Sequence, residues 1–383
     1  MKGENMILAH ISDLHLGKRL YDFSMLEDQR YILKEILRIV RQEKADGLLI
    51  AGDIYDKSVP SAEAVQLADE FLTQAAGLGI PVFLISGNHD SAPRLSFGAG
   101  FFRESGVHIA GTFDGEAKMV ELQDEYGSVR IHLLPFLKPA VVRHATGEEN
   151  IFTTQEAVET VIQQMQVDTS LRNVLVAHQF VTGAGRSDSE EVSVGGTENV
   201  DASVFADFDY TALGHIHMPQ HIGRETLRYC GTPLKYSFSE EKKEKSVTIV
   251  ELKEKGSITV REVALRPLRD MRSIRGAYME VTDKASYTEE NRMDDLRVIL
   301  TDEQDIPGGM EKLRTIYPNL MRLEYDNART RENRQISGTA EVQKKTENEI
   351  FGEFYIQMNN EPMSQSQTAF LEQLIRKIKE EPI

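Results

Sequence analysis

Five short, largely apolar runs constrain this chain more than any other feature of its sequence, because each leads directly into polar residues. The runs are Ile7–Ile11, Leu48–Ala51, Val82–Ile85, Val174–Ala177 and Tyr210–Leu213. Runs of this length are typical of strands that are buried on both faces. Helical patterns separate the first three, with three- and four-residue apolar spacing over Leu26–Lys44 and a helix-capping residue type at Ser61. The alternation predicts an α/β domain whose ligand-binding loops lie at the carboxyl ends of its strands.

Imidazole, carboxylate and amide groups follow the ends of these five runs. They are Asp13 and His15, then Asp53, then Asn88, His89 and Asp90, then His178, and finally His215 and His217. A lone histidine or aspartate at a strand end is more often structural, but five such groups in this order are expected to meet at one sheet edge. They exceed what one metal ion needs and suit two ions that share a bridging ligand, as in phosphoryl transfer. The sequence therefore predicts a two-ion site.

The first domain is expected to span residues 1–275, with a further helix over Ala92–Phe102. Later strands near Val247–Leu252 and Ser257–Leu265 are expected to complete a mixed sheet. The segment Arg266–Arg272 is interpreted as the exit from this domain. Each of these boundaries rests on periodicity and on turn residues alone.

Two further regions follow. Residues 276–340 are predicted to form a smaller α+β unit, with a strand at Ala277–Val281, a helix around Asn291–Leu300 and a strand at Leu320–Tyr325. Residues 326–348 are polar without periodicity and are interpreted as a linker. Residues 341–383 hold the end of that linker and C-terminal helices. Thr368–Lys379 forms an amphipathic pattern that could fold back on its own domain or, as we favour, dock on a partner.

Composition limits the function classes. The net charge of −17 taken alone argues against a nucleic-acid binder. Any DNA binding would have to come from metal ions, local basic residues or a partner chain. The single cysteine, Cys230, fits a reducing cytoplasm, and neither a signal peptide nor a membrane span is expected. The chain also lacks the Gly-x4-Gly-Lys-Ser/Thr pattern, so ATP hydrolysis would belong to another polypeptide.

The strand-end groups resemble those of a known family. Asp13-x-His15, Gly52-Asp53, Gly87-Asn88-His89-Asp90, His178 and Gly214-His215-x-His217 are similar to the motifs of the calcineurin-like metallophosphoesterases. The segments His10–Lys18, Ser193–Glu198 and Gly231–Ser237 resemble, more narrowly, the SbcD nuclease subunits of bacterial SbcCD complexes. The resemblance is close over residues 6–275 and looser beyond. It implies a metallophosphoesterase β-sandwich flanked by helices, with a small α+β capping domain and C-terminal helices.

The resemblance also implies roles for the residues that match. One ion would be held by Asp13, His15, Asp53 and His217, and the other by Asp53, Asn88, His178 and His215, with Asp53 as the bridge. His89 would stabilise the reacting phosphate or protonate the leaving oxygen, and Asp90 would orient the His89 ring. The mixed nitrogen and oxygen ligands fit Mn²⁺ best, although iron or zinc could bind.

The implied activity is cleavage of double-stranded DNA ends, driven by ATP through the ATPase partner SbcC, and of single-stranded or hairpin DNA, in repair and recombination. The capping unit would contact DNA, and the tail would bind SbcC. The helices after Asp56 and Asp90 would form the contact of a homodimer within a heterotetramer. The complex would be located in the cytoplasm and at the nucleoid. The alternatives are a small-substrate phosphodiesterase or phosphatase and a scaffold with a vestigial metal site.

The sequence leaves two alternative roles open for each of three residues near the first two motifs. Lys18 and Arg19 could contact a DNA phosphate or be ordinary solvated residues. Asp56 stands where archaeal and eukaryotic relatives carry a second functional histidine. Asp56 could position substrate, but we favour a cap for the helix that follows.

Overall fold

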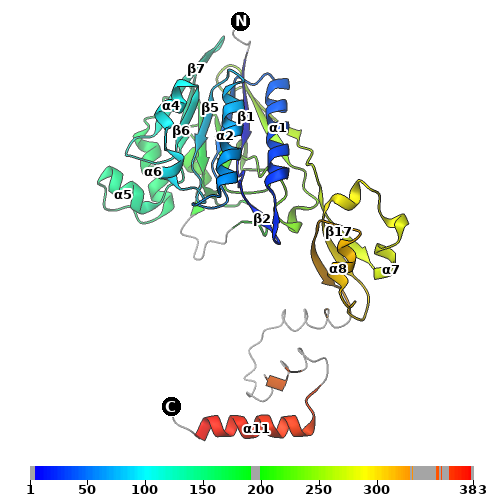
Figure 1. The fold of residues 1–383 in the computed structure, drawn as a ribbon. Coiled ribbons are helices and arrows are strands. Elements are labelled where there is room, and N and C mark those ends of the chain that lie inside the picture. The colour runs from blue at the N-terminus through cyan, green and yellow to red at the C-terminus, as the bar shows by residue number, and fades with distance from the viewer. Residues whose placement is uncertain are drawn as a thin grey trace. The chain divides into compact units, whose positions relative to one another are not determined.

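The structure, a computed structural model, describes residues 5–190, 199–327, 330, 351–352, 355 and 362–380 (Figure 1). The chain divides into two compact units, Met1–Glu324 and Tyr325–Ile383, which are described separately. The predicted linker lies largely outside the described residues, as does the segment Ser193–Glu198. Among the helices that are described, none combines the length and apolar character needed to cross a membrane.

The first unit is built on a six-stranded mixed sheet with the order β16-β15-β1-β4-β5-β6. Its strands are β1 (Met6–Ile11), β4 (Gly47–Ala51), β5 (Val82–Ile85), β6 (Val107–Ala110), β15 (Ser246–Leu252) and β16 (Ile258–Ala264). The strands β1, β4, β5 and β6 run parallel, whereas β15 and β16 are antiparallel to their neighbours. The apolar runs of the parallel strands are buried on both faces, as expected for such strands.

A second six-stranded sheet has the order β13-β14-β12-β9-β8-β7. Its strands are β7 (Lys118–Asp124), β8 (Gly127–Leu134), β9 (Arg172–His178), β12 (Tyr210–Gly214), β13 (Gln220–Ile222) and β14 (Arg224–Tyr229). The two sheets pack face to face, because Leu49 and Phe83 of the first share one apolar core with Val174 and Ala212 of the second. The predicted β-sandwich is confirmed.

Helices cover the outer faces of this sandwich. The first sheet is covered by α1 (Leu26–Gln42) and α2 (Ala62–Ala76), and the second by α5 (Pro139–Thr146) and α6 (Thr154–Gln164) (Figure 1). Ser61 caps α2 as predicted, because its side chain accepts a hydrogen bond from the backbone N–H of Ala64. The helix predicted over Ala92–Phe102 is wrong as a single element: α3 (Ala92–Leu95) and α4 (Ala99–Glu104) are separated by Gly98 at φ +74°.

A three-stranded sheet follows, and the sequence predicted two of its elements wrongly. The sheet joins β17 (Met271–Gly276), β18 (Asp295–Leu300) and β19 (Leu320–Tyr325), with α7 (Tyr278–Val281) and α8 (Gly309–Arg314) between them. The strand predicted at Ala277–Val281 is helix α7. The helix predicted around Asn291–Leu300 is a 3-10 turn (η4, Asn291–Met293) followed by strand β18. Leu296, Val298 and Leu300 are buried at alternate positions, which is the period of a strand. The predicted boundary at residue 275 falls inside β17.

Short elements complete the first unit. They are β2 (Arg19–Leu20), β3 (Phe23–Ser24), β10 (Phe180–Val181), β11 (Asn199–Val200) and the 3-10 turns η1 (Ala202–Phe205), η2 (Phe238–Glu240) and η3 (Lys284–Ser286). In the second unit, helix α11 (Gln365–Glu380) confirms the helix predicted for the tail. Leu371 on this helix is buried, while Phe370 and Leu374 are exposed.

Candidate metal centre

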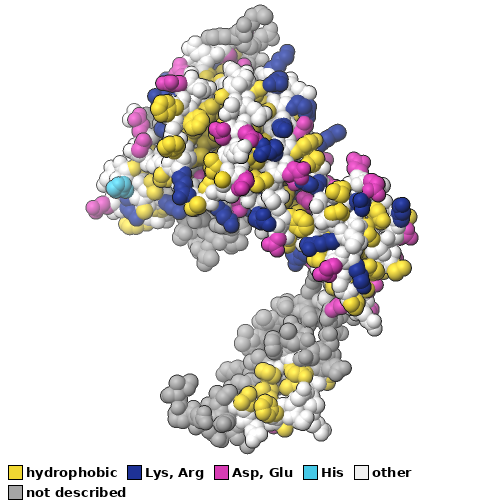
Figure 2. Space-filling model, viewed as in Figure 1, with side chains coloured by type: hydrophobic (Ala, Val, Ile, Leu, Met, Phe, Trp, Pro, Cys, Tyr) yellow, Lys and Arg dark blue, Asp and Glu magenta, His cyan; other side chains and the backbone are white. Residues whose placement is uncertain are grey.

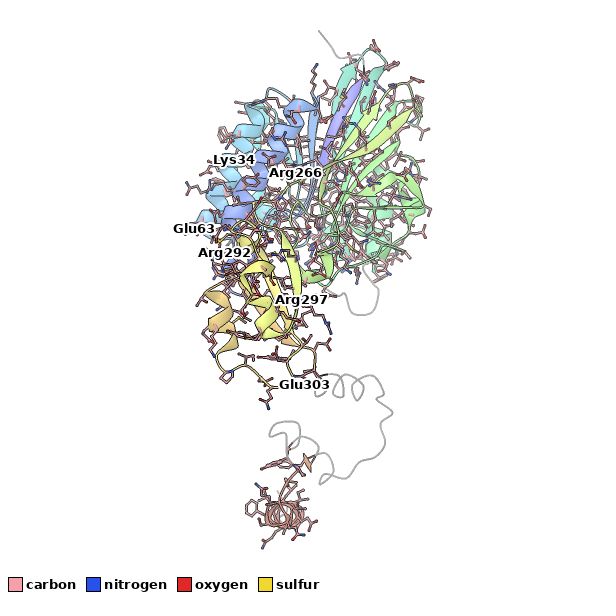
Figure 3. The ribbon with its side chains drawn as sticks, turned by 90° about the vertical axis from the view of Figure 1, so that its right-hand side faces the viewer. Lys34, Glu63, Arg266, Arg292, Arg297 and Glu303 are labelled. Atoms are coloured by element: carbon pink, nitrogen blue, oxygen red, sulfur yellow. The ribbon has the colours of Figure 1, made fainter. Side chains whose placement is uncertain are left out.

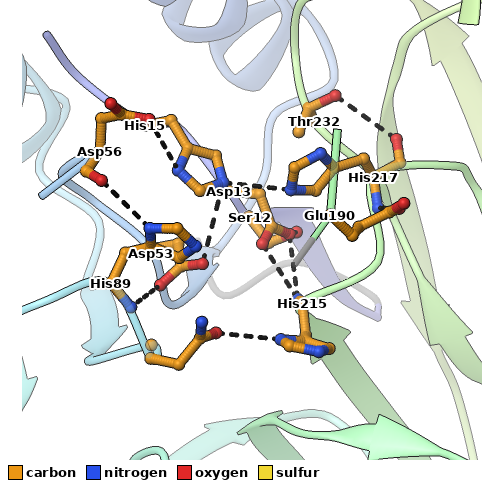
Figure 4. Close-up of polar contacts among 12 residues, drawn as sticks. Ser12, Asp13, His15, Asp53, Asp56, His89, Glu190, His215, His217 and Thr232 are labelled. Atoms are coloured by element: carbon orange, nitrogen blue, oxygen red, sulfur yellow. Dashed lines mark hydrogen bonds and ion pairs between the residues drawn. The ribbon is translucent and has the colours of Figure 1, made fainter. Parts of the chain in front are cut away.

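The predicted site residues lie where the carboxyl ends of both sheets meet. Asp13 and His15 follow β1, Asp53 follows β4 and Asn88 follows β5. From the other sheet, His178 ends β9, and His215 and His217 follow β12. Hydrogen bonds join the loops: the backbone N–H of Asp13 donates to the Gly52 carbonyl (3.0 Å), and that of His15 to the Asp53 carbonyl (3.0 Å). The sheet topology therefore gathers the predicted ligands at one place, and Figure 4 labels Asp13, His15, Asp53, His215 and His217 among them.

One group of ligand atoms comes from Asp13, His15 and His217, whose candidate atoms lie within 4.8 Å of one another. The Nε2 atoms of the two histidines face each other at 3.1 Å. Ser189 donates its only proton to Glu240, so its Oγ accepts from Nδ1–H of His217 (2.5 Å). Nε2 of neutral His217 therefore carries a lone pair that points at His15. A cation between the two rings fits this arrangement.

A second group comes from Asp53, Asn88, His178 and His215. Nδ1–H of His178 donates to the Ala51 carbonyl (2.8 Å), which directs Nε2 toward Oδ1 of Asn88 (3.0 Å) and Oδ2 of Asp53 (3.4 Å). Nδ1 of His215 lies 2.9 Å from the same Asn88 oxygen. Two imidazole nitrogens, a carboxylate oxygen and an amide oxygen thus converge, and a divalent cation can take the place of the protons that join them in the metal-free chain.

Asp53 lies between the two groups. Its Oδ2 is 3.8 Å from Nε2 of His15 and 3.4 Å from Nε2 of His178, while Oδ1 accepts a hydrogen bond from the backbone N–H of His89 (2.9 Å). Asp13, Asp53 and His178 also form a cluster of their own within 4.8 Å. One carboxylate can therefore serve both ligand groups.

The electrostatics of the site favour positive charge. Burial lowers the pKa of His15 and of His215 to about 3, so both rings are neutral at pH 7 and have lone pairs available. Burial also acts to lower the pKa of His178, but the charge of Asp53 and its hydrogen bond to the ring outweigh this and raise the pKa to about 9. Burial, together with the charge of Asp53, raises the pKa of Asp13 to about 7. Without a metal ion, the site draws protons onto His178 and Asp13.

We expect Mn²⁺ binding at pH 7 to release on the order of one proton per chain, since ligands bind metal in the deprotonated form. Both pKa values are raised, so His178 and Asp13 hold protons at low pH, and affinity for Mn²⁺ should increase as pH rises from 6 to 9. Calorimetric titration in buffers of different ionisation enthalpy measures the release. His178→Asn should reduce the release, and the exposed His144→Gln should not. A binding enthalpy independent of the buffer would contradict this prediction.

Backbone strain is concentrated at this site. Asp13, His15, Asp53 and His215 all have φ between 45° and 103°, a region that non-glycine residues rarely adopt. Strain of this kind costs about 1–3 kcal/mol per residue and persists where the surrounding structure enforces it. More than half of the predicted ligand positions are therefore held in backbone conformations that are energetically unfavourable for non-glycine residues.

Two glycines allow the close approach of the loops. A Cβ atom on Gly87 would lie 2.1 Å from Oδ1 of Asp53, and one on Gly214 would lie 1.8 Å from the Ala51 carbonyl oxygen. Gly87 is thus needed for the space beside Asp53 and not for an unusual φ angle. A larger residue at position 87 would push apart the loops that follow β4 and β5 of the first sheet, and one at position 214 would separate β12 of the second sheet from β4 of the first.

The structure brings His89 to the site but contradicts the predicted role of Asp90. The Asp90 carboxylate accepts hydrogen bonds from the backbone N–H groups of Ile54 (3.1 Å), Tyr55 (3.0 Å) and Gly87 (2.9 Å). Nδ1 of His89 donates instead to the backbone carbonyl of Asp56 (3.0 Å). Asp90 therefore joins the two loops that carry Asp53 and Asn88, because three unpaired N–H groups there need an acceptor.

The prediction that Asp56 caps the following helix is also wrong. Ser61 caps α2, whereas Oδ1 of Asp56 pairs with Nζ of Lys18 (2.7 Å) and lies 3.7 Å from Nδ1 of His15. Lys18 is thus paired with Asp56 beside the site. Arg19 lies further out, in a cleft of about 250 Å³ that Arg297 and Arg322 also line.

Sequence reasoning missed a buried network behind His217. The Glu190 carboxylate accepts from the backbone N–H of His217 (2.7 Å), and Ser189 joins the ring to Glu240. Lys245 donates to Glu240 (2.6 Å) and to the His217 carbonyl (2.8 Å). No sequence signal distinguished these residues, because they stand in polar stretches typical of exposed loops.

Comparisons with known proteins match two family models and several solved structures. A family model described as calcineurin-like phosphoesterase matches residues 6–219, and one described as type 5 capsule protein repressor C-terminal domain matches residues 267–359. Among solved structures, a dimetal phosphatase from Danio rerio aligns with a TM-score of 0.43 at 11% identity, over 68% of this chain and 96% of that chain.

Two bacterial proteins named as the SbcD component of the nuclease SbcCD are similar along nearly the whole chain. The protein of Staphylococcus epidermidis is 32% identical over 377 residues, which is 97% of this chain and 98% of that protein. The protein of Staphylococcus saprophyticus is 32% identical over 392 residues, which is 98% of this chain and 99% of that protein. The chain therefore belongs to the calcineurin-like phosphoesterase family and, within it, to the SbcD family of SbcCD nuclease subunits.

Proposed function

We propose that this chain is the two-metal DNA nuclease subunit of an SbcCD-like complex. It would cleave double-stranded ends, in a reaction that depends on ATP through an SbcC partner, and single-stranded or hairpin DNA, in DNA repair and recombination. The observation that supports the proposal is the convergence of two groups of imidazole, carboxylate and amide side chains on Asp53. This activity implies that the protein is located in the cytoplasm and associates with the nucleoid when it is bound to DNA.

The two ligand groups would hold the two ions, with Asp53 as the shared ligand. Asp13, His15 and His217 would complete one site, and Asn88, His178 and His215 the other. When bound, two divalent ions polarise the scissile phosphate and lower the pKa of a water nucleophile. Mn²⁺ suits a mixed imidazole, carboxylate and amide ligand set and is the ion we propose.

His89 would act on the substrate and not on the ions. Its Nδ1–H is held by the Asp56 carbonyl (3.0 Å), and its ring packs edge-on against His15 at 4.8 Å between centroids. These contacts fix the ring and leave Nε2 for the substrate. A half-buried histidine in this position can give a proton to the leaving oxygen or stabilise negative charge on the phosphate.

Arginines beside the site support a DNA substrate in spite of the negative net charge. Arg19 of the main domain and Arg297 and Arg322 of the small sheet line one cleft, and Figure 3 labels Arg297 on the small sheet. Basic side chains are also visible over the lower part of the main domain and over the small domain in Figure 2. Arg322 pairs with Glu324 (2.7 Å) and Arg297 lies 3.6 Å from Glu241, so a backbone phosphate of DNA would have to compete with these carboxylates for the arginines.

Exposed apolar side chains support the proposed partners. Phe97, in the turn between α3 and α4, is 85% exposed, and Phe101 of α4 is 81% exposed, which suits a homodimer contact through this region within a heterotetramer. In the second unit, Phe370 and Leu374 of α11 remain exposed, which suits docking on an SbcC-type ATPase.

The competing function is hydrolysis of a small phosphodiester, since the metal ligands alone do not set substrate size. The experiment compares the isolated chain with Mn²⁺ on hairpin DNA and on bis(p-nitrophenyl) phosphate. We expect cleavage of the hairpin, and its loss on chelation with EDTA. Activity confined to the small phosphodiester would overturn the nuclease assignment and keep the metal site.

A further inference from the structure

His15 differs from two other proposed ligands in what its outer nitrogen contacts. Nδ1 of His178 donates to the Ala51 carbonyl, and Nδ1 of His217 donates to Ser189. Among the described residues, Nδ1 of His15 is buried and has no hydrogen-bond partner. Its Nε2 faces Nε2 of His217 at 3.1 Å, on the side of the proposed ion, so a neutral His15 ring that binds an ion through Nε2 carries its proton on Nδ1. An unpaired buried N–H group is unfavourable, and ligating histidines nearly always donate that proton to a second residue.

Asp56 is the acceptor placed to meet this proton. Its Oδ1 lies 3.7 Å from Nδ1 of His15, just beyond hydrogen-bond distance. Backbone hydrogen bonds hold the two segments together: the N–H of Leu16 donates to the Ile54 carbonyl (2.9 Å), and that of Asp56 to the Leu16 carbonyl (3.2 Å). A side-chain shift of less than about 1 Å would therefore close the contact, and Figure 4 shows the carboxylate beside the ring.

Lys18 holds this carboxylate in place through an ion pair. Nζ of Lys18 donates to Oδ1 of Asp56 at 2.7 Å and lies 5.4 Å from the centroid of the Tyr236 ring. Both members of the pair have side chains that are only 15% exposed, so the pair is partly shielded from water. The ion pair therefore limits the positions that the Asp56 side chain can adopt beside the His15 ring.

We propose that Asp56 is the positioning residue for His15, accepting its Nδ1–H when Nε2 binds a divalent ion, with Lys18 holding the Asp56 side chain in place. The inference rests on the proposed ligand assignment of His15. The resulting Lys18–Asp56–His15 series would fix the ring orientation and raise the basicity of Nε2. The same residue fixes His89 through its backbone carbonyl, so residue 56 would align one ligand and the proposed proton donor.

The test measures Mn²⁺ affinity without DNA, from the electron paramagnetic resonance signal of free Mn²⁺ during titration. The full chain should bind two ions. Asp56→Ala removes the carboxylate but keeps the carbonyl that holds His89, and it should weaken one of the two sites by about 10–100-fold. Asp56→Asn keeps an uncharged acceptor, so its affinity for Mn²⁺ should lie between that of Asp56→Ala and that of the unmodified chain. Asp207→Ala, at an exposed aspartate outside the site, is the matched control and should titrate like the unmodified chain.

A double-variant comparison separates positioning from a general structural effect. In a His15→Ala background, Asp56→Ala should cause no further loss of affinity, because its target is gone. Unchanged Mn²⁺ binding in Asp56→Ala would overturn the inference. If Asp56→Ala does not fold, unchanged binding in Asp56→Asn would overturn it. Failure of the ligand assignment looks different, since His15→Ala alone would then bind Mn²⁺ as tightly as the unmodified chain.

Discussion

His89→Ala is expected to slow cleavage of single-stranded DNA by about 10²–10⁴-fold and to leave two Mn²⁺ ions bound. A decrease in rate of this size is typical when a positioned general acid, or an imidazole that stabilises charge, is removed. Nε2 is free for the substrate because Nδ1–H of His89 is engaged by the Asp56 carbonyl. Activity is measured at saturating Mn²⁺, so that the rate reports the chemistry and not metal loading.

The metal content of the same variant tests a competing role. Candidate atoms of His89, His15 and Asp53 lie within 4.8 Å of one another, so His89 could in principle be a ligand. Loss of one ion from His89→Ala would assign it to the metal site, and an unchanged rate would remove it from the mechanism. His221→Ala, at an exposed histidine, is the control for a general effect of losing an imidazole.

Much of the fold and most of the ligand positions could be predicted from local sequence. Short apolar runs identify buried strands, and the carboxyl ends of neighbouring parallel strands meet at one edge of a sheet. The cap at Ser61 was predictable because a capping side chain contacts a backbone group only three residues away. Such features depend on neighbours along the chain, which a single sequence displays.

The small sheet was harder to predict because its pairing is not local. The sequence predicts a helix around Asn291–Leu300, but Leu296 and Val298 lie in strand β18, which pairs with β17 from earlier in the chain. Short apolar segments fit either period when nothing nearby decides between them. Asp90 was misassigned for a related reason: its carboxylate is engaged by N–H groups of a loop more than thirty residues away.

The strained backbone and the network behind His217 could not be predicted at all. A positive φ at Asp13 or His215 is imposed by packing between two sheets, and no residue type marks it. Glu240 and Lys245 stand at the two ends of a charged stretch that is typical of exposed surface. In the fold, Glu240 is fully buried and Lys245 is 5% exposed. Their burial becomes visible only once the carbonyl of His217 is placed beside them.

Lys245→Met is expected to lower the free energy of unfolding by about 3–5 kcal/mol, because it leaves the Glu240 carboxylate buried without its cation. It also removes a donor to the His217 carbonyl, so Mn²⁺ affinity should fall as well. Urea unfolding of the metal-free chain measures the first effect apart from the second. Lys253→Met, which breaks an exposed pair with Glu251, should cost no more than about 1 kcal/mol. The double variant Glu240→Gln/Lys245→Met should be less destabilised than Lys245→Met, since the unpaired charge is then gone. If the free energy of unfolding falls no more in Lys245→Met than in Lys253→Met, the buried Lys245–Glu240 pair does not stabilise the structure around His217.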